Sequence, residues 1–213
     1  CRYCFRRHFD YAGNTPGRAR WQEALDYIRR DDSITEVIYS GGDPLAAGDS
    51  LLAWLTEQLA GIPHLTRLRV HTRLPVVIPA RIDAECLAWL AGTRLQTSLV
   101  LHVNHANELD ADVAATVGLL RAAGITELNQ SVLLAGVNDC AERLTQLSEQ
   151  LFSAGILPYY LHLLDRVQGA AHFAVDQARA ITLHRAMLAR LPGYLVPRLV
   201  EEVPALPYKR PIN

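Results

Sequence analysis

The sequence predicts an α/β fold, a partial βα barrel whose sheet is parallel. Strand-like and amphipathic helical segments alternate about six times, and short glycine-marked turns separate them. Polar residues gather just after the predicted strands, and the carboxyl ends of parallel strands share one edge of a barrel. The 213 residues contain no repeat, linker or low-complexity tract, so we expect a single domain over 1–213.

Strands are predicted where apolar residues run together or alternate between turns. TEVIYS (35–40) is typical of a buried strand and leads into SGGDP. LTRLRVHT (65–72) alternates apolar and polar residues, as a half-buried strand does. The same reasoning predicts further strands at 95–103, 126–134, 157–164 and 194–200.

Helices are predicted between these strands. The first is indicated by the helical spacing of Trp21, Ala24, Leu25 and Ile28. The segment 50–61 is amphipathic and closes on a glycine, and 83–92 begins at Asp83, a suitable N-cap. Other helices are expected at 108–124, 140–155 and 175–191. The proline-rich segment 204–213 cannot be helical and should be extended or turning.

Composition excludes several classes of protein. The formal net charge of -1 gives no electrostatic reason to expect nucleic acid or an anionic membrane as a main partner. No apolar run approaches the roughly 20 residues that span a bilayer, and no signal peptide is visible. Four cysteines are too few for a disulfide framework at this length, which favours a reducing, cytoplasmic location.

The first candidate site is the cysteine pair of CRYCFRRHF, Cys1 and Cys4. A CxxC pair fits half of a zinc site, a redox pair or part of an iron–sulfur site. A thioredoxin-like pair should open a helix directly after a strand, which Arg6 and Arg7 do not suggest, and no second CxxC or HxxxH follows to complete a zinc site. Two incidental cysteines remain the alternative.

The second candidate site is SGGDP at 40–44. Gly41 and Gly42 follow a buried strand and let the backbone approach a ligand closely. Asp43 adds a carboxylate beside exposed peptide groups, which suits an amino-acid-like ligand. The alternative is an ordinary βα turn in which Asp43 caps the next helix.

Together, CRYC–FRR and the later strand–GGDP on a βα repeat resemble the radical S-adenosylmethionine enzymes, whose cluster motif is CxxxCxxC. Cys1 and Cys4 would be the second and third cysteines of that motif. The resemblance implies that the first cysteine and the first strand of the barrel precede the given sequence. The abrupt end after PALPYKRPIN suggests a cut at that end too.

The resemblance extends in order along nearly the whole chain. CRYCFRRHF, SGGDPL, RLPVVIPARI, HVNHANEL, NQSVLLAGVND, PYYLHLLDRVQGAAHF and GYLVPRL together are similar to the lysine 2,3-aminomutase family. HLLDRVQGAAHF and LPYKRPIN most resemble its branch that modifies elongation factor P. This implies isomerisation of L-lysine to (R)-β-lysine, which a partner ligase attaches to elongation factor P.

For the radical chemistry, the resemblance implies a 4Fe–4S cluster that Cys1 and Cys4 help to hold and that binds S-adenosylmethionine. The residues implied for the S-adenosylmethionine side are Gly41, Gly42, Asp43, His102 and Gln130. For His102, a satisfied structural histidine is an equal alternative. Cys86 and Cys140 are interpreted as structural, because Cys140 lacks the partners of the zinc site in longer family members.

The resemblance also implies pyridoxal 5′-phosphate, bound as a Schiff base by Lys209 in the C-terminal segment 203–213. Arg6 matches the arginine that pairs with the substrate carboxylate, and Asp165 matches an aspartate that holds the distal amine. Glu202 stands where the family has a second aspartate, which puts recognition of that amine in doubt.

Two other functions compete with lysine isomerisation. An aminomutase of the same family could act on another amino acid such as glutamate, but Asp165 and Glu202 favour a cationic side chain. A non-catalytic, metal-binding βα scaffold would bind neither iron nor pyridoxal and would tolerate loss of Lys209. Two questions stay open. One is whether the protein forms a homo-oligomer, and the other is whether its substrate is free lysine or lysine already attached to a protein.

Overall fold

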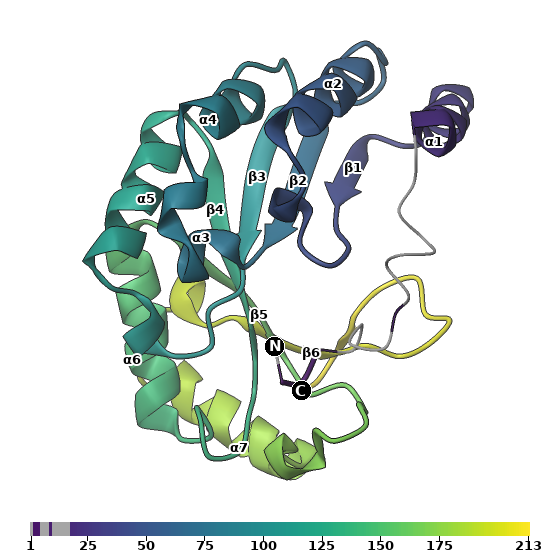
Figure 1. Ribbon diagram of the computed structural model, residues 1–213. Coiled ribbons are helices and arrows are strands. Elements are labelled where there is room, and N and C mark those ends of the chain that lie inside the picture. The colour runs from purple at the N-terminus through teal and green to yellow at the C-terminus, as the bar shows by residue number, and fades with distance from the viewer. Residues whose placement is uncertain (1, 5–8, 10–17) are drawn as a thin grey trace.

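The computed structural model describes residues 2–4, 9 and 18–213. Its centre is a seven-stranded sheet whose strands follow one another in sequence order (Figure 1). Neighbouring strands from the first to the sixth are parallel, and the seventh is antiparallel to the sixth. The strands are β1 (Glu36–Tyr39), β2 (Arg67–Thr72), β3 (Gln96–Leu101), β4 (Thr126–Val132), β5 (Leu157–His162), β6 (Arg198–Glu201) and β7 (Arg210–Pro211).

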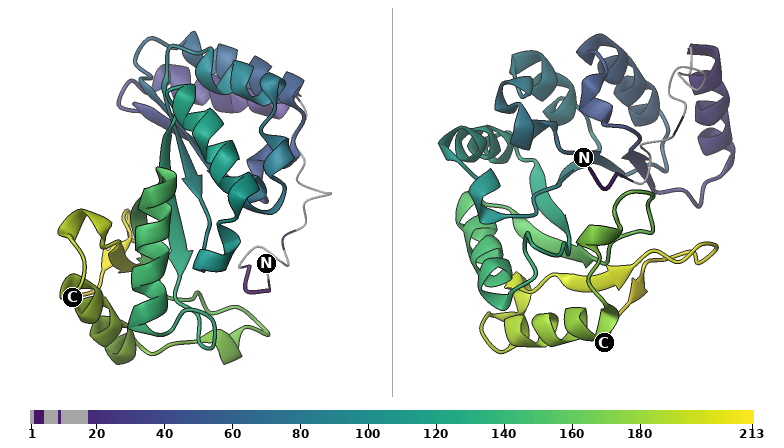
Figure 2. Two further views of the ribbon diagram at one scale, coloured as in Figure 1. Left: turned by 90° about the vertical axis from the view of Figure 1, so that its left-hand side faces the viewer. Right: turned by 60° about the horizontal axis from the view of Figure 1, so that its bottom comes forward.

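Helices cover one face of this curved sheet. Figure 1 shows α2, α4, α5, α6 and α7 along the convex side, whereas the other side of the sheet is concave. Figure 2 shows the same curvature from two further directions. The bounds are α1 (Arg18–Arg30), α2 (Asp49–Ala60), α3 (Leu74–Val77), α4 (Ala84–Ala91), α5 (Ala111–Ala122), α6 (Ala141–Ala154) and α7 (Gln177–Leu188).

Strand alternation divides the side chains between the two faces. Leu68 and Val70 are fully buried in the core beneath the helices, together with Leu99 of the neighbouring strand. Arg69 and His71 alternate with them and are only half-buried. Because successive strand residues point to opposite faces, these two lie on the concave side. The polar half of the LTRLRVHT pattern thus faces the barrel interior.

Several predicted element boundaries are confirmed. Asp83 caps α4 by accepting a hydrogen bond of 2.9 Å from the Cys86 amide, and Gly61 ends α2. The segment 204–213 contains no helix. None of the helices described by the structure is long and apolar enough to cross a membrane.

Three expectations need correction. The sheet is not wholly parallel, because β7 returns beside β6 as the second arm of a hairpin. The strand predicted at 194–200 is limited to β6, since a short 3₁₀ turn, η5 (Gly193–Leu195), precedes it and Pro197 cannot donate a ladder hydrogen bond. The helix predicted at 108–124 starts only at α5, because Asp110 caps its amino end.

Candidate active site

Lys209 lies on the β6–β7 hairpin and forms an ion pair with Glu202. Its ammonium nitrogen lies 5.9 Å from the centroid of the Tyr160 ring. Lys209 is also the single lysine among the 21 Lys and Arg residues of the sequence. This amine therefore combines a carboxylate partner with a flat aromatic face beside it.

Two histidines of the concave face lie close to Lys209. Burial lowers the pKa of His71 to about 4, and the nearby cations Arg69 and Lys209 lower it too. Burial likewise lowers the pKa of His162 to about 4, with Lys209 and then His71 as further causes. Both imidazoles are therefore neutral at pH 7 and can hydrogen-bond without adding positive charge beside Lys209.

Two buried nitrogens of this face are without a hydrogen-bond partner in the part of the chain that the structure describes. One is Nε2 of His71 and the other is Nε of Arg69. A different nitrogen of Arg69, Nη2, pairs with Glu36 of β1 at 2.7 Å. Buried polar atoms are nearly always satisfied in folded proteins, so these two point to a missing partner.

Asp165 follows β5 and lies near the same hairpin. Burial raises the pKa of its carboxyl, as does the charge of Glu202, whereas Lys209 lowers it. Asp165 also lines a cavity of about 340 Å³ formed by the loop after β5. The cavity is lined by Leu164, Asp165, Arg166, Val167, Gln168, Ala170, Ala171 and Ala174.

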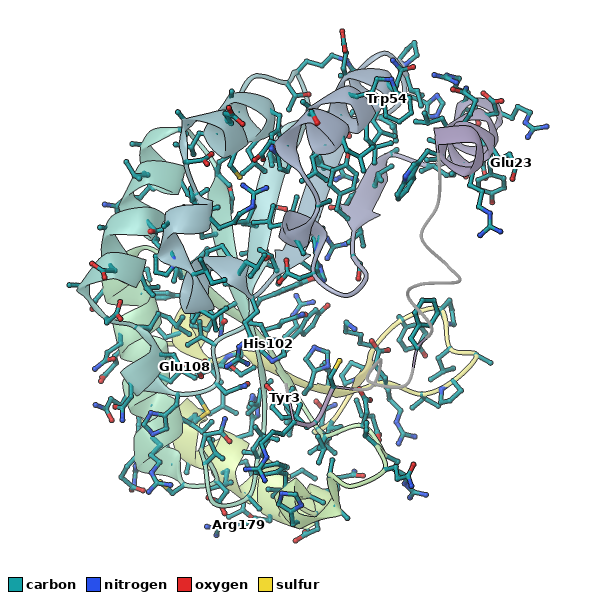
Figure 3. The ribbon with its side chains drawn as sticks, viewed as in Figure 1. Tyr3, Glu23, Trp54, His102, Glu108 and Arg179 are labelled. Atoms are coloured by element: carbon teal, nitrogen blue, oxygen red, sulfur yellow. The ribbon has the colours of Figure 1, made fainter. Side chains whose placement is uncertain are left out.

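Tyr3, from the cysteine loop, lies against the carboxyl ends of β2 and β3. Its hydroxyl is 3.1 Å from Nε2 of His102 and 3.3 Å from Nη1 of Arg73, and it also accepts a hydrogen bond from Asn104. Arg73 in turn binds Glu108 at 2.6 Å. Figure 3 shows Tyr3 pointing toward His102 and Glu108 at these strand ends. The contacts hold the loop that carries Cys4 to the sheet.

Asp43 is engaged in fixing the turn after β1. Its carboxylate accepts hydrogen bonds from the Thr72 hydroxyl at 2.6 Å, the Arg73 amide at 2.7 Å and the amides of Leu74 and Leu45. The Leu45 bond caps a short 3₁₀ helix, so the capping alternative holds for this carboxylate. Gly41 has φ of 149°, a conformation that favours glycine.

Polar side chains also join the loops after β3 and β4. Asn104 accepts a hydrogen bond of 2.8 Å from the Val132 amide, and Asn138 donates to the carbonyl oxygens of both residues at 2.9 Å. Asn129 makes a similar pair of bonds to the backbone of Val103. These buried amides fix the strand ends that carry His102.

The structure thus brings only some of the predicted residues together. Lys209, Glu202 and Asp165 lie near one another, and Gln130 is a half-buried residue of β4. Gly41, Gly42, Asp43 and His102 belong to the strand ends from β1 to β3. His102 is engaged by Tyr3, and burial chiefly lowers its pKa. Cys1 and Arg6 lie outside the described residues.

Sequence reasoning missed Arg69, His71, Tyr160 and His162. Their signal was the polar half of each strand's alternation, which in a barrel faces the interior rather than solvent.

The cysteines differ in their surroundings. Cys4 is half-buried with a free thiol, and Cys86 is a free, fully buried thiol whose pKa burial raises to about 11. Cys140 precedes α6. Within residues 2–4, 9 and 18–213, no group of three or more histidine, cysteine, aspartate or glutamate side chains could hold a metal ion.

Curated relatives match the chain over its whole length. It is 56% identical to an L-lysine 2,3-aminomutase of Haemophilus influenzae, with 98% of this chain and 62% of the relative covered. It is 52% identical to that of Escherichia coli, covering 100% and 62%, and 34% identical to that of Clostridium subterminale, covering 100% and 51%. The chain therefore spans between half and two thirds of these relatives' lengths. No family model matches it.

Solved structures share the fold at low sequence identity. A radical SAM methyltransferase from Sphaerobacter thermophilus matches with a TM-score of 0.58 and 16% identity, over 85% of this chain and 56% of that one. Spore photoproduct lyase complexed with a dinucleoside spore photoproduct matches with a TM-score of 0.55 and 14% identity, over 93% and 72%. The curved, mostly parallel half-barrel is thus the fold of these proteins.

Proposed function

We propose that the chain belongs to the lysine 2,3-aminomutase family and that the whole protein isomerises L-lysine to (R)-β-lysine. The proposed cofactors are pyridoxal 5′-phosphate, S-adenosylmethionine and a 4Fe–4S cluster. The observation that carries the proposal is the placement of Lys209, the one lysine of the chain, beside Glu202, Asp165 and the ring of Tyr160.

The donor set around Lys209 fits pyridoxal phosphate. A primary amine is needed to bond the aldehyde, and Lys209 supplies it. The Tyr160 ring offers a flat surface near that amine. Nε of Arg69, which has no hydrogen-bond partner among the described residues, is a donor suited to an acceptor-rich, phosphorylated ring. These residues would hold the cofactor.

The cysteine loop fits the radical side of the proposed reaction. Cys1 and Cys4 would supply two cluster thiolates, and a third would precede Cys1. Tyr3 connects this loop to the ends of β2 and β3. Gly41 and Gly42 would let S-adenosylmethionine approach the backbone, while Asp43 holds their turn in shape. His102 and Gln130 would complete that side of the cleft.

The cofactors would divide the chemistry between them. When bound, the cluster and S-adenosylmethionine supply a carbon radical, and pyridoxal phosphate supplies the π-system across which the substrate nitrogen migrates. The chain's part is to orient the substrate and exclude water from the concave face.

Substrate selection would rest on charge. Arg6 would pair with the α-carboxylate, and Asp165 and Glu202 would face the distal ammonium. Lys209 acts as a nucleophile only as the neutral amine, so Glu202 must part from it before either residue acts. The freed carboxylate would then be available to a second cation. Two carboxylates at this end favour lysine over glutamate.

The physiological role proposed is supply of β-lysine for attachment to elongation factor P by its lysyl ligase. Support comes from HLLDRVQGAAHF and LPYKRPIN, which resemble the branch that modifies elongation factor P. In a cell lacking the protein, mass spectrometry of elongation factor P should show loss of the β-lysyl group. An unchanged modification would reject this role while leaving the reaction itself intact.

The reaction is tested on the full-length protein, purified without oxygen. Incubation with L-lysine, S-adenosylmethionine and a reductant should yield β-lysine, with iron and pyridoxal found by assay. Both cofactors without β-lysine from lysine, but with product from another amino acid, would keep the chemistry and reject the substrate. Absence of both cofactors would reject the proposed reaction and favour the alternative of a non-catalytic scaffold.

A further inference from the structure

His71 is a half-buried residue of the concave face whose role has not been assigned. It is the last but one residue of β2, and its register partner on β3 is Val100. Nε2 is buried and has no hydrogen-bond partner among the described residues. A buried polar atom left unsatisfied destabilises a folded protein, so its retention needs a reason.

The surroundings of His71 show what kind of partner is missing. Arg69 and Lys209 are close enough to lower the pKa of His71. His71 in turn is close enough to lower the pKa of His162. The His162 ring packs edge-on against Tyr160, with centroids 5.6 Å apart, and the Lys209 amine lies 5.9 Å from the Tyr160 centroid. His71 therefore belongs, with Arg69, Tyr160 and His162, to a polar wall around Lys209.

No protein group in the described part of the chain hydrogen-bonds Nε2 of His71. Glu36 binds Arg69 and Glu202 binds Lys209, so these two carboxylates are committed to other cations. A ligand bonded to Lys209 would come within reach of the same wall. Pyridoxal phosphate is rich in hydrogen-bond acceptors, and a neutral imidazole can donate to one of them.

We propose that His71, through Nε2, hydrogen-bonds pyridoxal phosphate held by Lys209 and so fixes its position in the barrel. This inference rests on the proposed function. In this proposal His71 contacts the cofactor. The unsatisfied Nε2 destabilises the protein without cofactor, and the hydrogen bond formed on binding offsets that loss. Stability and cofactor affinity should consequently respond in opposite directions when His71 is replaced.

The test uses the full-length protein, stripped of cofactor, with pyridoxal phosphate as the probe. Dissociation constants come from the absorbance of the bound pyridoxal, and thermal stability is measured without cofactor. In His71→Leu we expect about tenfold weaker binding and a shifted absorption maximum, with a melting temperature equal to or above the wild type. His71→Gln, which keeps a donor, should bind with intermediate affinity.

His184→Gln is the matched control, because His184 bonds the Pro197 carbonyl at 2.9 Å, outside the wall around Lys209. It should leave the affinity for pyridoxal phosphate unchanged. Unaltered affinity and spectrum in His71→Leu would overturn the inference, as would a His71→Leu protein that is less stable or fails to fold without cofactor. If the wild type itself binds no pyridoxal phosphate, the proposed function fails instead.

Discussion

Lys209 and Glu202 form an ion pair across the hairpin of β6 and β7. Both lie near Asp165, whose pKa rises partly because Glu202 is close. The pair joins the amine proposed to hold the cofactor to a carboxylate proposed to hold the substrate.

Glu202→Gln should weaken binding of L-lysine. The substitution removes one of two carboxylates facing the distal ammonium, and a charge-assisted bond of this kind corresponds to roughly 10- to 100-fold in affinity. The KM for lysine should rise by that factor in steady-state assays of β-lysine. Glu201→Gln is the control, because Glu201 binds Arg210. Equal KM values for the two variants would contradict the role of Glu202.

Asp165→Asn should raise the KM for lysine while leaving pyridoxal in place. The amide keeps the shape of the side chain but loses the negative charge, so about a tenfold or larger rise is expected. Pyridoxal absorbance gives the second readout. Loss of that absorbance, with KM unchanged, would place Asp165 beside the cofactor instead of the substrate.

Tyr3→Phe should loosen the cysteine loop. Removing the hydroxyl leaves His102 and Asn104 without a contact that they make in the structure, a loss of about 1–2 kcal/mol. Iron content after purification without oxygen should fall, and the cluster should decay faster in air. Tyr194→Phe is the control, since Tyr194 is 59% exposed. Identical cluster lifetimes in both variants would contradict the proposed role of the Tyr3 hydroxyl in holding the cysteine loop.

Glu127→Gln should stabilise the protein at pH 8. Burial raises the pKa of Glu127 from 4.5 to about 7, and Glu127 is 3% exposed with one oxygen unpartnered among the described residues. A raised pKa contributes stability below about pH 4.5 that is lost as the pH rises through about 7. Denaturant unfolding should show a gain of about 1–3 kcal/mol at pH 8 and less at pH 5. If the variant and the wild type differed in free energy of unfolding by the same amount at pH 5 and pH 8, the raised pKa of Glu127 would be refuted.

Alternation and capping predicted most of the fold, because each uses residues close together in sequence. Asp83 and Gly61 mark helix ends by local geometry alone. β7 was missed because it has only two residues and exists through its pairing with β6. The short helix α3, beginning beside Pro75, was missed for a similar reason, since four residues carry no periodicity.

The site was less predictable than the fold. Lys209 came from the resemblance, since a lone lysine in a proline-rich segment is ordinarily solvated. His71 was hidden because alternation shows that a side chain leaves the core but not whether it meets solvent or a barrel interior. The hydrogen bonds of Asp43 to Thr72 and Arg73 could not be predicted, because these partners lie at the end of a strand distant in sequence.

The proposed bond between Lys209 and pyridoxal phosphate can be tested by locating the pyridoxal group in the chain. The full-length protein loaded with pyridoxal phosphate would be reduced with borohydride, digested and analysed by mass spectrometry. We expect a reduced pyridoxyl group on Lys209, and its disappearance together with the pyridoxal absorbance in Lys209→Ala. A pyridoxyl group on a different lysine, or none at all, would contradict the proposed bond.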